Sequence, residues 1–382
     1  DRETYYLIGD GPDGTGLYRL KDTDADDKAD TCELIHKFKG GMGEHGPHAI
    51  VAGPDGYLYV NSGNHAWITA TPEPGSPVEP YFDLGHLQKD PNTRPRRGQQ
   101  QQGQPAADLD KEVEIAGNKV PLRDLLLGYE ADLLPKYEDA NGHAVGIKVP
   151  GSSIWRLDPN GKHFTLEAAG FRNQYDFAIN SLGEMFTFDS DMEWDEFLPW
   201  YRPVAVFHSP PGADHGWRSG SNVGPDYYID NLPWTVATGR GSPCGVVFYD
   251  HTVFPSNYQN ALFITDWSYG RIFTVFLKRD GASFKAATEE FVTGKPLNVT
   301  DVEVAPDGSL FFTTGGRNTE GGVYRVRYQP PGLAASEPVA SDSKVEAAIR
   351  AALNQRQPLS AWGRNGIRQA QEQAGDEWGP ML

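Results

Sequence analysis

Short runs of alternating apolar and aromatic residues recur along this chain, and turn residues separate one run from the next. Three of the turns have nearly the same form, in GPDGYLYVNSG from Gly53, NSLGEMFTFDSD from Asn180 and APDGSLFFTTGG from Ala305. Each is typical of a tight turn that leads into a strand. The stretch from Gly56 to Gly308 accommodates five or six units of roughly 40–50 residues. The pattern predicts an all-β chain and a β-propeller, with a β-sandwich as the alternative.

Composition supports many short strands and excludes several classes of protein. Gly 43 and Pro 29 among the 382 residues, with 12% aromatic residues, favour tight turns over long helices. The formal net charge of −18 argues against nucleic acid as a partner, because phosphate binding needs a basic face. It fits an acidic protein that is periplasmic or otherwise extracytoplasmic. No apolar run is long enough to span a membrane. Cys32 and Cys244 are either two thiols or one disulfide, and no CxxCH haem-attachment motif occurs.

Two segments interrupt the β-pattern. Residues 67–150 hold proline-rich and glutamine-rich stretches before a helix-like PLRDLLLGYEADLLPKY, which predicts an insertion within one blade. Residues 331–342 have the composition of a linker, and residues 343–382 follow as an α-helical extension. The propeller itself is therefore expected within residues 1–330. The chain opens with the pattern of interior β-structure, so we expect a mature or truncated piece of a longer protein.

The acidic loop DTDADDKADTCE matches the calcium-loop template D-x-D-x-D with further ligands at positions 9 and 12. Carboxylates this close repel one another unless a divalent cation holds them together. Asp27 stands where the template prefers glycine, and aspartate tolerates the left-handed conformation better than most residues. The sequence predicts a structural Ca²⁺ in a β-hairpin turn, with a solvated acidic loop as the alternative. The predicted ligands are the side chains of Asp22, Asp24, Asp26, Asp30 and Glu33 and the carbonyl of Lys28.

Histidines form a second group of candidate residues. Glu44 and His45 precede one predicted strand, and Asn64 and His65 follow its hairpin partner, so the four side chains are expected at one rim. An imidazole beside a carboxylate is suited to take a proton from a hydroxyl group. For each single histidine, a hydrogen-bonded loop position is the alternative. No G-x-S-x-G or H-E-x-x-H occurs, which argues against serine hydrolases and zincins.

Polar residues gather in a third place, the stretch GFRNQYDFAINSLGEMFTFDSDMEWD. Arg172 and Asn173 lead into one predicted strand, and the next strand ends in several carboxylates. Buried charges are costly unless they are paired or ligated, so this stretch fits a charged cofactor or a polyol better than a core. His208, His215 and Trp217 follow and are expected near the same rim. Packing between blades is the alternative for the tryptophan.

Several of these phrases together resemble one family. In the order seen in the soluble PQQ-dependent glucose/sorbosone dehydrogenase superfamily, the chain carries EHGPHAIVAGPDGYLYVNSGNHA, GFRN, GADHGWRSG, GSPCGVVFYDHTVFP, ALFITDW and NVTDVEVAPDGSLFFTTGG. The closer likeness is to the membrane-bound dehydrogenase propellers of planctomycete-type haem-binding multidomain proteins, which share GFRNQYDFAIN, DMEWD and PWYRP. The resemblance covers about residues 1–330. It implies a six-bladed β-propeller followed by helical HEAT-like repeats and a c-type haem domain.

The resemblance also implies roles for single residues. His45 matches the family's catalytic base, which takes the hydroxyl proton as hydride passes to the quinone. Arg172 and Asn173 match an Arg-Asn pair that contacts PQQ, and the acidic run that follows matches a loop that helps to bind the cofactor's Ca²⁺. The predicted cofactor-binding residues are Arg172, Asn173, Asp191, Glu193, His215 and Arg271.

The chain also departs from the family pattern. Asn298 and Thr300 stand where two PQQ-contacting arginines are expected, and Trp267 lies where the family has a lysine, with Arg271 as the cation nearby. PQQ carries three carboxylates, so the loss of cationic partners weakens its binding. The strand-like runs amount to about five blades, so we expect a sixth from upstream sequence or from another chain.

Two functions follow as expectations. The first is a quinoprotein-like dehydrogenase that oxidises a sugar or polyol with PQQ and Ca²⁺ and passes electrons to a cytochrome c domain or another subunit. The second is a non-catalytic propeller, a carbohydrate-binding or protein-assembly module that has lost PQQ. His45 and the Arg-Asn pair favour the first, and the missing cations favour the second.

Overall fold

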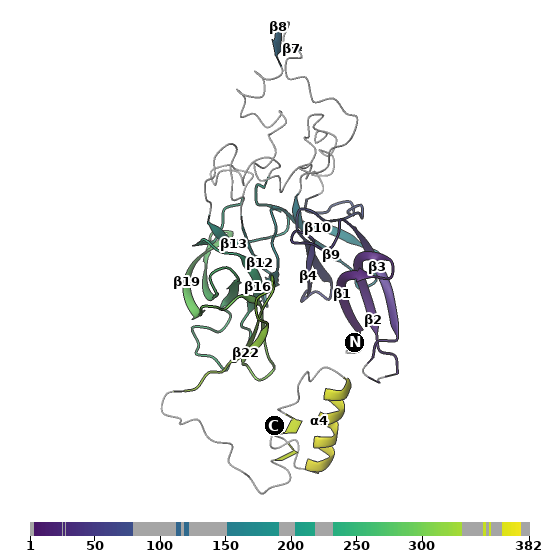
Figure 1. The fold of residues 1–382 in the computed structure, drawn as a ribbon, viewed down its shortest axis with the longest axis vertical. Helices are drawn as coiled ribbons and strands as arrows, with labels where there is room; N and C mark the ends of the chain where they lie inside the picture. The colour runs from purple at the N-terminus through teal and green to yellow at the C-terminus, as the bar shows by residue number, and fades with distance from the viewer. Residues whose placement is uncertain are drawn as a thin grey trace.

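The computed structural model describes residues 4–24, 26, 28–78, 112–115, 118–121, 151–190, 203–217, 232–330, 347–348, 351–352 and 361–375. Within these residues the chain is built of β-strands, apart from helical residues near the C-terminus (Figure 1). The strands form five sheets of three to five strands, which we call blades 1 to 5 in chain order, and a separate two-stranded hairpin.

The bounds of the strands are as follows. Blade 1 has the order β1 (Thr4–Gly11), β2 (Gly14–Lys21), β3 (Thr31–Lys39) and β6 (Trp67–Ile68). Blade 2 has the order β4 (Pro47–Ala52), β5 (Leu58–Ser62), β9 (Ser152–Leu157), β10 (Phe164–Phe171) and β14 (Ala213–Asp214). Blade 3 has β11 (Phe177–Ile179), β12 (Met185–Asp189), β13 (Val204–His208) and β15 (Val236–Gly239). Blade 4 has β16 (Pro243–Phe248), β17 (Leu262–Asp266), β18 (Arg271–Asp280) and β19 (Ser283–Thr293). Blade 5 has β20 (Val299–Val304), β21 (Leu310–Thr314) and β22 (Gly322–Val326).

The three repeated turns are present, and they occupy the same place in three blades. Each joins the first strand of its blade to the second, in blades 2, 3 and 5. Gly56, Gly183 and Gly308 have φ angles of 81°, 83° and 74°, a left-handed conformation that costs other residues energy. Each glycine donates its backbone N–H to the carbonyl three residues earlier, at 2.8–3.1 Å. The repeated phrase therefore encodes one repeated turn.

Apolar clusters join the blades in chain order. One cluster holds Leu17 of blade 1 with Trp155 of blade 2, and a second holds Phe171 of blade 2 with residues of blade 3. Two further clusters join blade 3 to blade 4 and blade 4 to blade 5. Burying one side chain of this size contributes roughly 1.5–3 kcal/mol. Packing of one sheet face on the next is therefore the main source of stability.

The molecule is thus an all-β propeller with about five blades. β4 lies against β1 and β11, and β16 lies against β11 and β20, so the first strands of the blades follow one another. Among the described residues, no apolar cluster joins blade 5 to blade 1, and no sixth blade is present. Tyr6 and Ile8 of β1 pack against blade 2. On the opposite face of β1, Tyr5 and Leu7 remain 47% and 52% exposed.

Two parts of the predicted domain plan are described only in pieces. The expected insertion contains the hairpin of β7 (Glu112–Ile115) and β8 (Asn118–Pro121). The expected linker lies outside the described residues. In the expected extension, helix α4 (Ala361–Ala374) lies apart from the blades in Figure 1. None of the described helices has the length and apolar character needed to cross a membrane.

Blades 4 and 5 approach each other closely at Gly245 in β16. A Cβ atom at this position would lie 2.5 Å from Asp301 Oδ1 and 2.7 Å from Asp301 Cα in β20. These distances are shorter than a van der Waals contact. Only a residue without a side chain fits between the two strands.

Replacing Gly245→Ala should destabilise the chain by about 1–3 kcal/mol, because the backbone of β20 would have to move. Gly41→Ala is the matched control, since a Cβ atom at Gly41 meets nothing within 4 Å. Urea unfolding followed by tryptophan fluorescence compares the two variants. Equal stability of both would show that blades 4 and 5 do not pack this closely.

Candidate functional site

His45 lies in the loop before β4, and only 5% of the residue is exposed. Its Nδ1 is 2.6 Å from Oδ1 of Asn64, which follows β5. The amide oxygen can only accept a hydrogen bond, so the neutral ring carries its proton on Nδ1 and its lone pair on Nε2. The ring also stacks on His65, with centroids 4.6 Å apart. The hairpin of blade 2 therefore brings these three side chains together.

The Arg-Asn pair reaches the same place from the loop before β11. The backbone N–H of Asn64 donates to the carbonyl of Arg172 at 3.2 Å. The side chain of Asn173 donates through Nδ2 to the carbonyl of Glu44 at 3.0 Å, and its Oδ1 lies 2.8 Å from His48 Nε2. We call the group of Glu44, His45, Asn64, Arg172 and Asn173 the rim.

Asp189, at the end of β12, holds the backbone of the Arg-Asn pair. Its buried carboxylate accepts the N–H groups of Arg172 at 2.9 Å and of Asn173 at 3.1 Å. Burial raises the pKa of Asp189 to about 6, although these hydrogen bonds and the Arg172 guanidinium act in the opposite direction. The Arg172 side chain turns toward Ser190, with Nη1 3.3 Å from its Oγ.

A guanidinium also reaches the rim from Arg317, a residue that no sequence motif indicated as part of the site. It lies in the loop between β21 and β22, and its Nη2 pairs with the carboxylate of Glu44. Its guanidinium carbon is 5.8 Å from the ring centroid of Trp267, which donates through Nε1 to the carbonyl of Gly315 at 2.6 Å. The contact joins blade 5 to the loop before blade 2, so only the three-dimensional fold could reveal it.

Arg271 is engaged within blade 4 rather than with the rim. Its Nη2 forms an ion pair with the buried carboxylate of Asp266 at 2.5 Å, and Nη1 lies 3.4 Å from Glu290. Nη2 also donates to the carbonyl of Arg240 at 2.7 Å. Asp266 in turn accepts the backbone N–H of Ser242 at 2.8 Å. This guanidinium therefore holds the loop before β16 to the end of β17.

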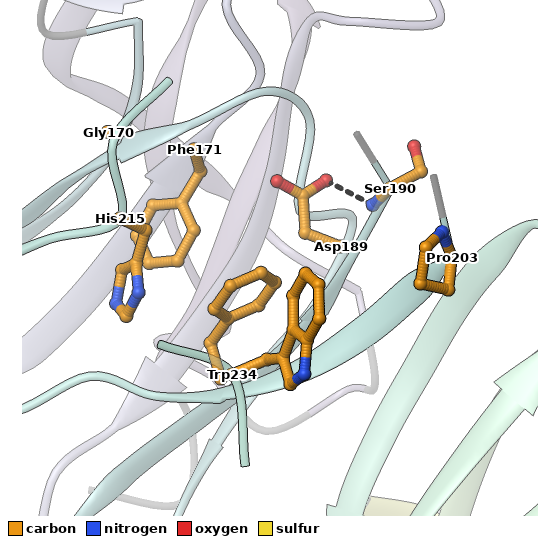
Figure 2. A pocket seen from close by; sticks show the side chains of 8 residues that line it. Gly170, Phe171, Asp189, Ser190, Pro203, His215 and Trp234 are labelled. Atoms are coloured by element: carbon orange, nitrogen blue, oxygen red, sulfur yellow. Dashed lines mark hydrogen bonds between the residues drawn. The ribbon is translucent and has the colours of Figure 1, made fainter. Parts of the chain in front are cut away.

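A pocket lies where the end of β10 of blade 2 meets blade 3 (Figure 2). The ring of His215 lies in its wall, 4.5 Å from Phe171, and Ser209 Oγ is 3.2 Å from His215 Nε2. Burial lowers the pKa of His215 to about 3, so this ring is a neutral part of an aromatic wall. The lining residues are Gly170, Phe171, Asp189, Ser190, Pro203, Phe207, His215 and Trp234.

Other expected site residues lie elsewhere. Trp217 is fully buried, so its ring packs between strands and offers no exposed face to a ligand. His208 lies between blades 3 and 4 and contacts Ser283 of β19. Asp191 and Glu193 fall outside the described residues.

Three of the predicted calcium ligands come together in the turn between β2 and β3. Carboxylate oxygens of Asp22, Asp24 and Asp30 all lie within 4.8 Å of one another, and Asp22 is buried. Asp30 also accepts hydrogen bonds from the backbone N–H and the hydroxyl of Thr23, at 2.9 and 2.6 Å. This geometry fits a divalent cation bound by three carboxylates.

Two other predicted ligands have side-chain contacts with residues outside this cluster. Asp26 accepts the backbone N–H of Lys28 at 2.9 Å, and its other oxygen lies 3.6 Å from Lys28 Nζ. Glu33 lies in β3 and pairs with Arg19 at 2.6 Å. The loop is therefore not a full copy of the template, because its twelfth residue belongs to a strand.

Carboxyl groups also occur just before the first strand of blade 3 and on the first strand of blade 5. Burial raises the pKa of Asp176 to about 8, and the nearby charges of Asp301 and Glu303 raise it further. Burial likewise raises the pKa of Asp301 and Glu303. Asp176 accepts the backbone N–H of Val246 at 2.7 Å and so links blade 3 to blade 4.

No protein-family model matches this chain, and no curated protein matches it. Similar solved structures include a candidate oxidoreductase (glucose dehydrogenase) from Thermus thermophilus, at 15% identity over 84% of this chain and 78% of that one, with a TM-score of 0.49. The PQQ-bound aldose sugar dehydrogenase from Streptomyces coelicolor is 12% identical over 85% and 74%, with a TM-score of 0.46. The soluble aldose sugar dehydrogenase from Escherichia coli is 14% identical over 81% and 74%, with a TM-score of 0.45. Likenesses this weak carry no argument about activity.

The buried ring of His215 should make the fold sensitive to acid. Its folded pKa of about 3 lies below the ordinary value of 6.5, so unfolding takes up a proton between these pH values. The stability that it contributes is complete above about pH 6.5 and is lost as the pH falls toward about 3. His215→Gln should therefore flatten the loss of stability in acid, as measured by urea unfolding at several pH values.

Ser209→Ala is the control for this experiment, because it removes the neighbouring hydroxyl and keeps the imidazole. Asp189 titrates with the opposite sign, but it is present in every variant and cancels from the comparison. An acid dependence that His215→Gln leaves unchanged would contradict the burial of a neutral ring.

Proposed function

We propose that this chain is a dehydrogenase-like propeller whose rim binds a sugar or polyol, with His45 as the base that takes a proton from a substrate hydroxyl. The observation that carries the proposal is the 2.6 Å contact between His45 Nδ1 and Asn64 Oδ1. It holds the ring in the tautomer whose Nε2 carries the lone pair that a base needs. The amide of Asn173 and the guanidinium of Arg172 are suited to bind further hydroxyl groups.

The described residues do not fit PQQ, the cofactor that the family resemblance implies. Its three carboxylates need cationic partners. Arg271 is committed to Asp266, and Arg317 is paired with Glu44. Asn298, which stands where an arginine is expected, donates its amide to the carbonyl of Trp267 at 3.1 Å. We therefore assign no step to this quinone.

A second candidate function is a carbohydrate-binding or protein-assembly propeller that has lost PQQ. The engagement of Arg271 and Arg317 in ion pairs favours it. The rim would then keep its hydroxyl-binding groups without a hydride acceptor. A cytochrome partner, Ca²⁺ at a cofactor and a periplasmic or otherwise extracytoplasmic location belong to the first candidate and are proposed only with it.

A panel of aldoses and polyols tests the two candidates. Titration calorimetry should detect binding to the chain, and Asn173→Ala should weaken it by about tenfold, as expected for the loss of a hydrogen bond. A dye-coupled assay, run with and without added PQQ and Ca²⁺, then measures oxidation, because the described residues do not fit PQQ and the dye can itself act as the electron acceptor. If the first candidate is right, His45→Gln should lower the rate by about 10²–10⁴-fold, the usual contribution of a general base.

His163→Gln is the matched control, because this histidine is exposed and pairs with Glu73 away from the rim. Binding without oxidation would support the sugar-binding propeller and refute the dehydrogenase. A chain that binds no member of the panel would refute both candidates.

We also propose that Asp22, Asp24 and Asp30 bind a structural Ca²⁺. Calcium at about 100 times its Kd should then stabilise the chain by about 2.7 kcal/mol, because the folded state alone holds the three carboxylates together. Asp24→Asn should abolish this gain, and Asp13→Asn, in the turn between β1 and β2, should keep it. Thermal melting with and without chelator measures both effects. Melting that chelator does not change, with no metal by elemental analysis, would refute the site.

A further inference from the structure

Four polar side chains meet at the interface of blades 3 and 4, and none of them belongs to the rim. His208 ends β13 and is 1% exposed. Its Nε2 is 2.8 Å from Oε2 of Glu184, and its Nδ1 is 3.1 Å from Oγ of Ser283. Arg279 lies 2.7 Å from the other oxygen of Glu184. Glu184 and His208 come from blade 3, whereas Arg279 and Ser283 come from blade 4.

These contacts fix the direction of each proton. A carboxylate only accepts, so His208 carries its proton on Nε2 and donates it to Glu184. Nδ1 then holds the lone pair, and the hydroxyl of Ser283 donates to it. Partial burial acts to raise the pKa of Glu184, but the hydrogen bonds from His208 and Arg279 outweigh it and hold this pKa below its usual value. The hydroxyl proton of Ser283 therefore points at a basic nitrogen.

The surrounding residues hold this arrangement in place. Glu184 follows the tight turn of blade 3, where its backbone N–H donates to Oδ1 of Asn180 at 2.9 Å. The ring of His208 lies against Phe186 and Phe284, with centroids 5.0 and 4.9 Å apart. A ring in contact with two phenyl groups cannot turn freely. Nδ1 of His208 is therefore held toward the serine.

The nucleophile lies beside the surface. Ser283 is the first residue of β19 and pairs with Asp280 across a two-residue turn. The turn residues, Gly281 and Ala282, are exposed, and Ser283 itself is half-buried. The hydroxyl of Ser283 therefore lies next to exposed turn residues.

We propose that Ser283, His208 and Glu184 form a nucleophilic site that hydrolyses small esters. A serine hydroxyl that donates to an imidazole, whose other nitrogen is held by a carboxylate, is the arrangement that activates serine. Here Nδ1 faces the serine and Nε2 faces the carboxylate. No sequence motif indicates the site, because its three members come from three separate segments of two blades.

The chemistry requires no further reactant besides water. Ser283 Oγ forms a bond to the acyl carbon as its proton passes to Nδ1 of His208. The bond to the alcohol oxygen then breaks, and the alcohol leaves with that proton. Water attacks the acyl-serine with the same histidine as base, which releases the acid and restores the hydroxyl. The net reaction converts an ester and water into an acid and an alcohol.

Covalent labelling of the full chain with a fluorophosphonate probe tests the site. Mass spectrometry should locate the adduct on Ser283, and Ser283→Ala should lose it. The same variant should lower hydrolysis of p-nitrophenyl acetate by about 10²-fold or more, since the nucleophile is removed. Ser268→Ala is the matched control, because Ser268 is an exposed serine of the same blade and should leave both readouts unchanged.

Glu184→Gln separates reactivity from folding, because it keeps the shape of the side chain and removes the charge that orients His208. We expect it to slow labelling by about tenfold or more, while urea unfolding shows a folded chain. The proposal would be overturned if the folded parent chain does not react with the probe, or if labelling survives Ser283→Ala. The cluster would then be a set of contacts that only stabilises the interface of blades 3 and 4.

Discussion

Apolar packing between neighbouring blades is the constraint on which the rest of this structure depends. Successive residues of a strand point to opposite faces, so a blade between two neighbours needs apolar side chains on both. MFTFD in β12 and LFITD in β17 show the result, since both strands are buried at every position. Phe186 of blade 3 and Phe263 of blade 4 are fully buried in this way. The charged residue of each of these two strands, Asp189 or Asp266, stands at the strand end.

The last residue of the second strand of a blade has different roles in blades 3 and 4. Asp189 ends β12 and Asp266 ends β17, and each accepts a backbone N–H from the loop before the first strand of its own blade. In blade 3 that loop carries the Arg-Asn pair, so the carboxylate supports the rim. In blade 4 the carboxylate also forms an ion pair with Arg271, so this guanidinium is not available to a ligand. The carboxylate at this position therefore supports ligand-binding groups in blade 3, whereas in blade 4 it occupies the Arg271 guanidinium.

How far the sequence predicts a feature depends on how local its cause is. The turn at Gly183 depends on a few adjacent residues, and the contact of His45 with Asn64 depends on one hairpin, so both could be expected. Glu33 fitted a calcium template by spacing, yet it stands directly opposite Arg19 on a neighbouring strand and pairs with it. Contacts between blades have no local signal at all. The pairing of Arg317 with Glu44 and the array around His208 are of this kind.

The groups near the rim suit a neutral ligand better than one that carries several carboxylates. Arg317 is paired with the carboxylate of Glu44, and Arg172 Nη1 lies 3.3 Å from the hydroxyl of Ser190. To use the cation of Arg317, a ligand with three carboxylates would have to break the ion pair with Glu44, and the freed carboxylate would then repel it. A neutral polyol meets neither cost, because its hydroxyl groups can donate to carboxylates and accept from amides. A neutral polyol is therefore a better match for the proposed rim than a ligand with several carboxylates.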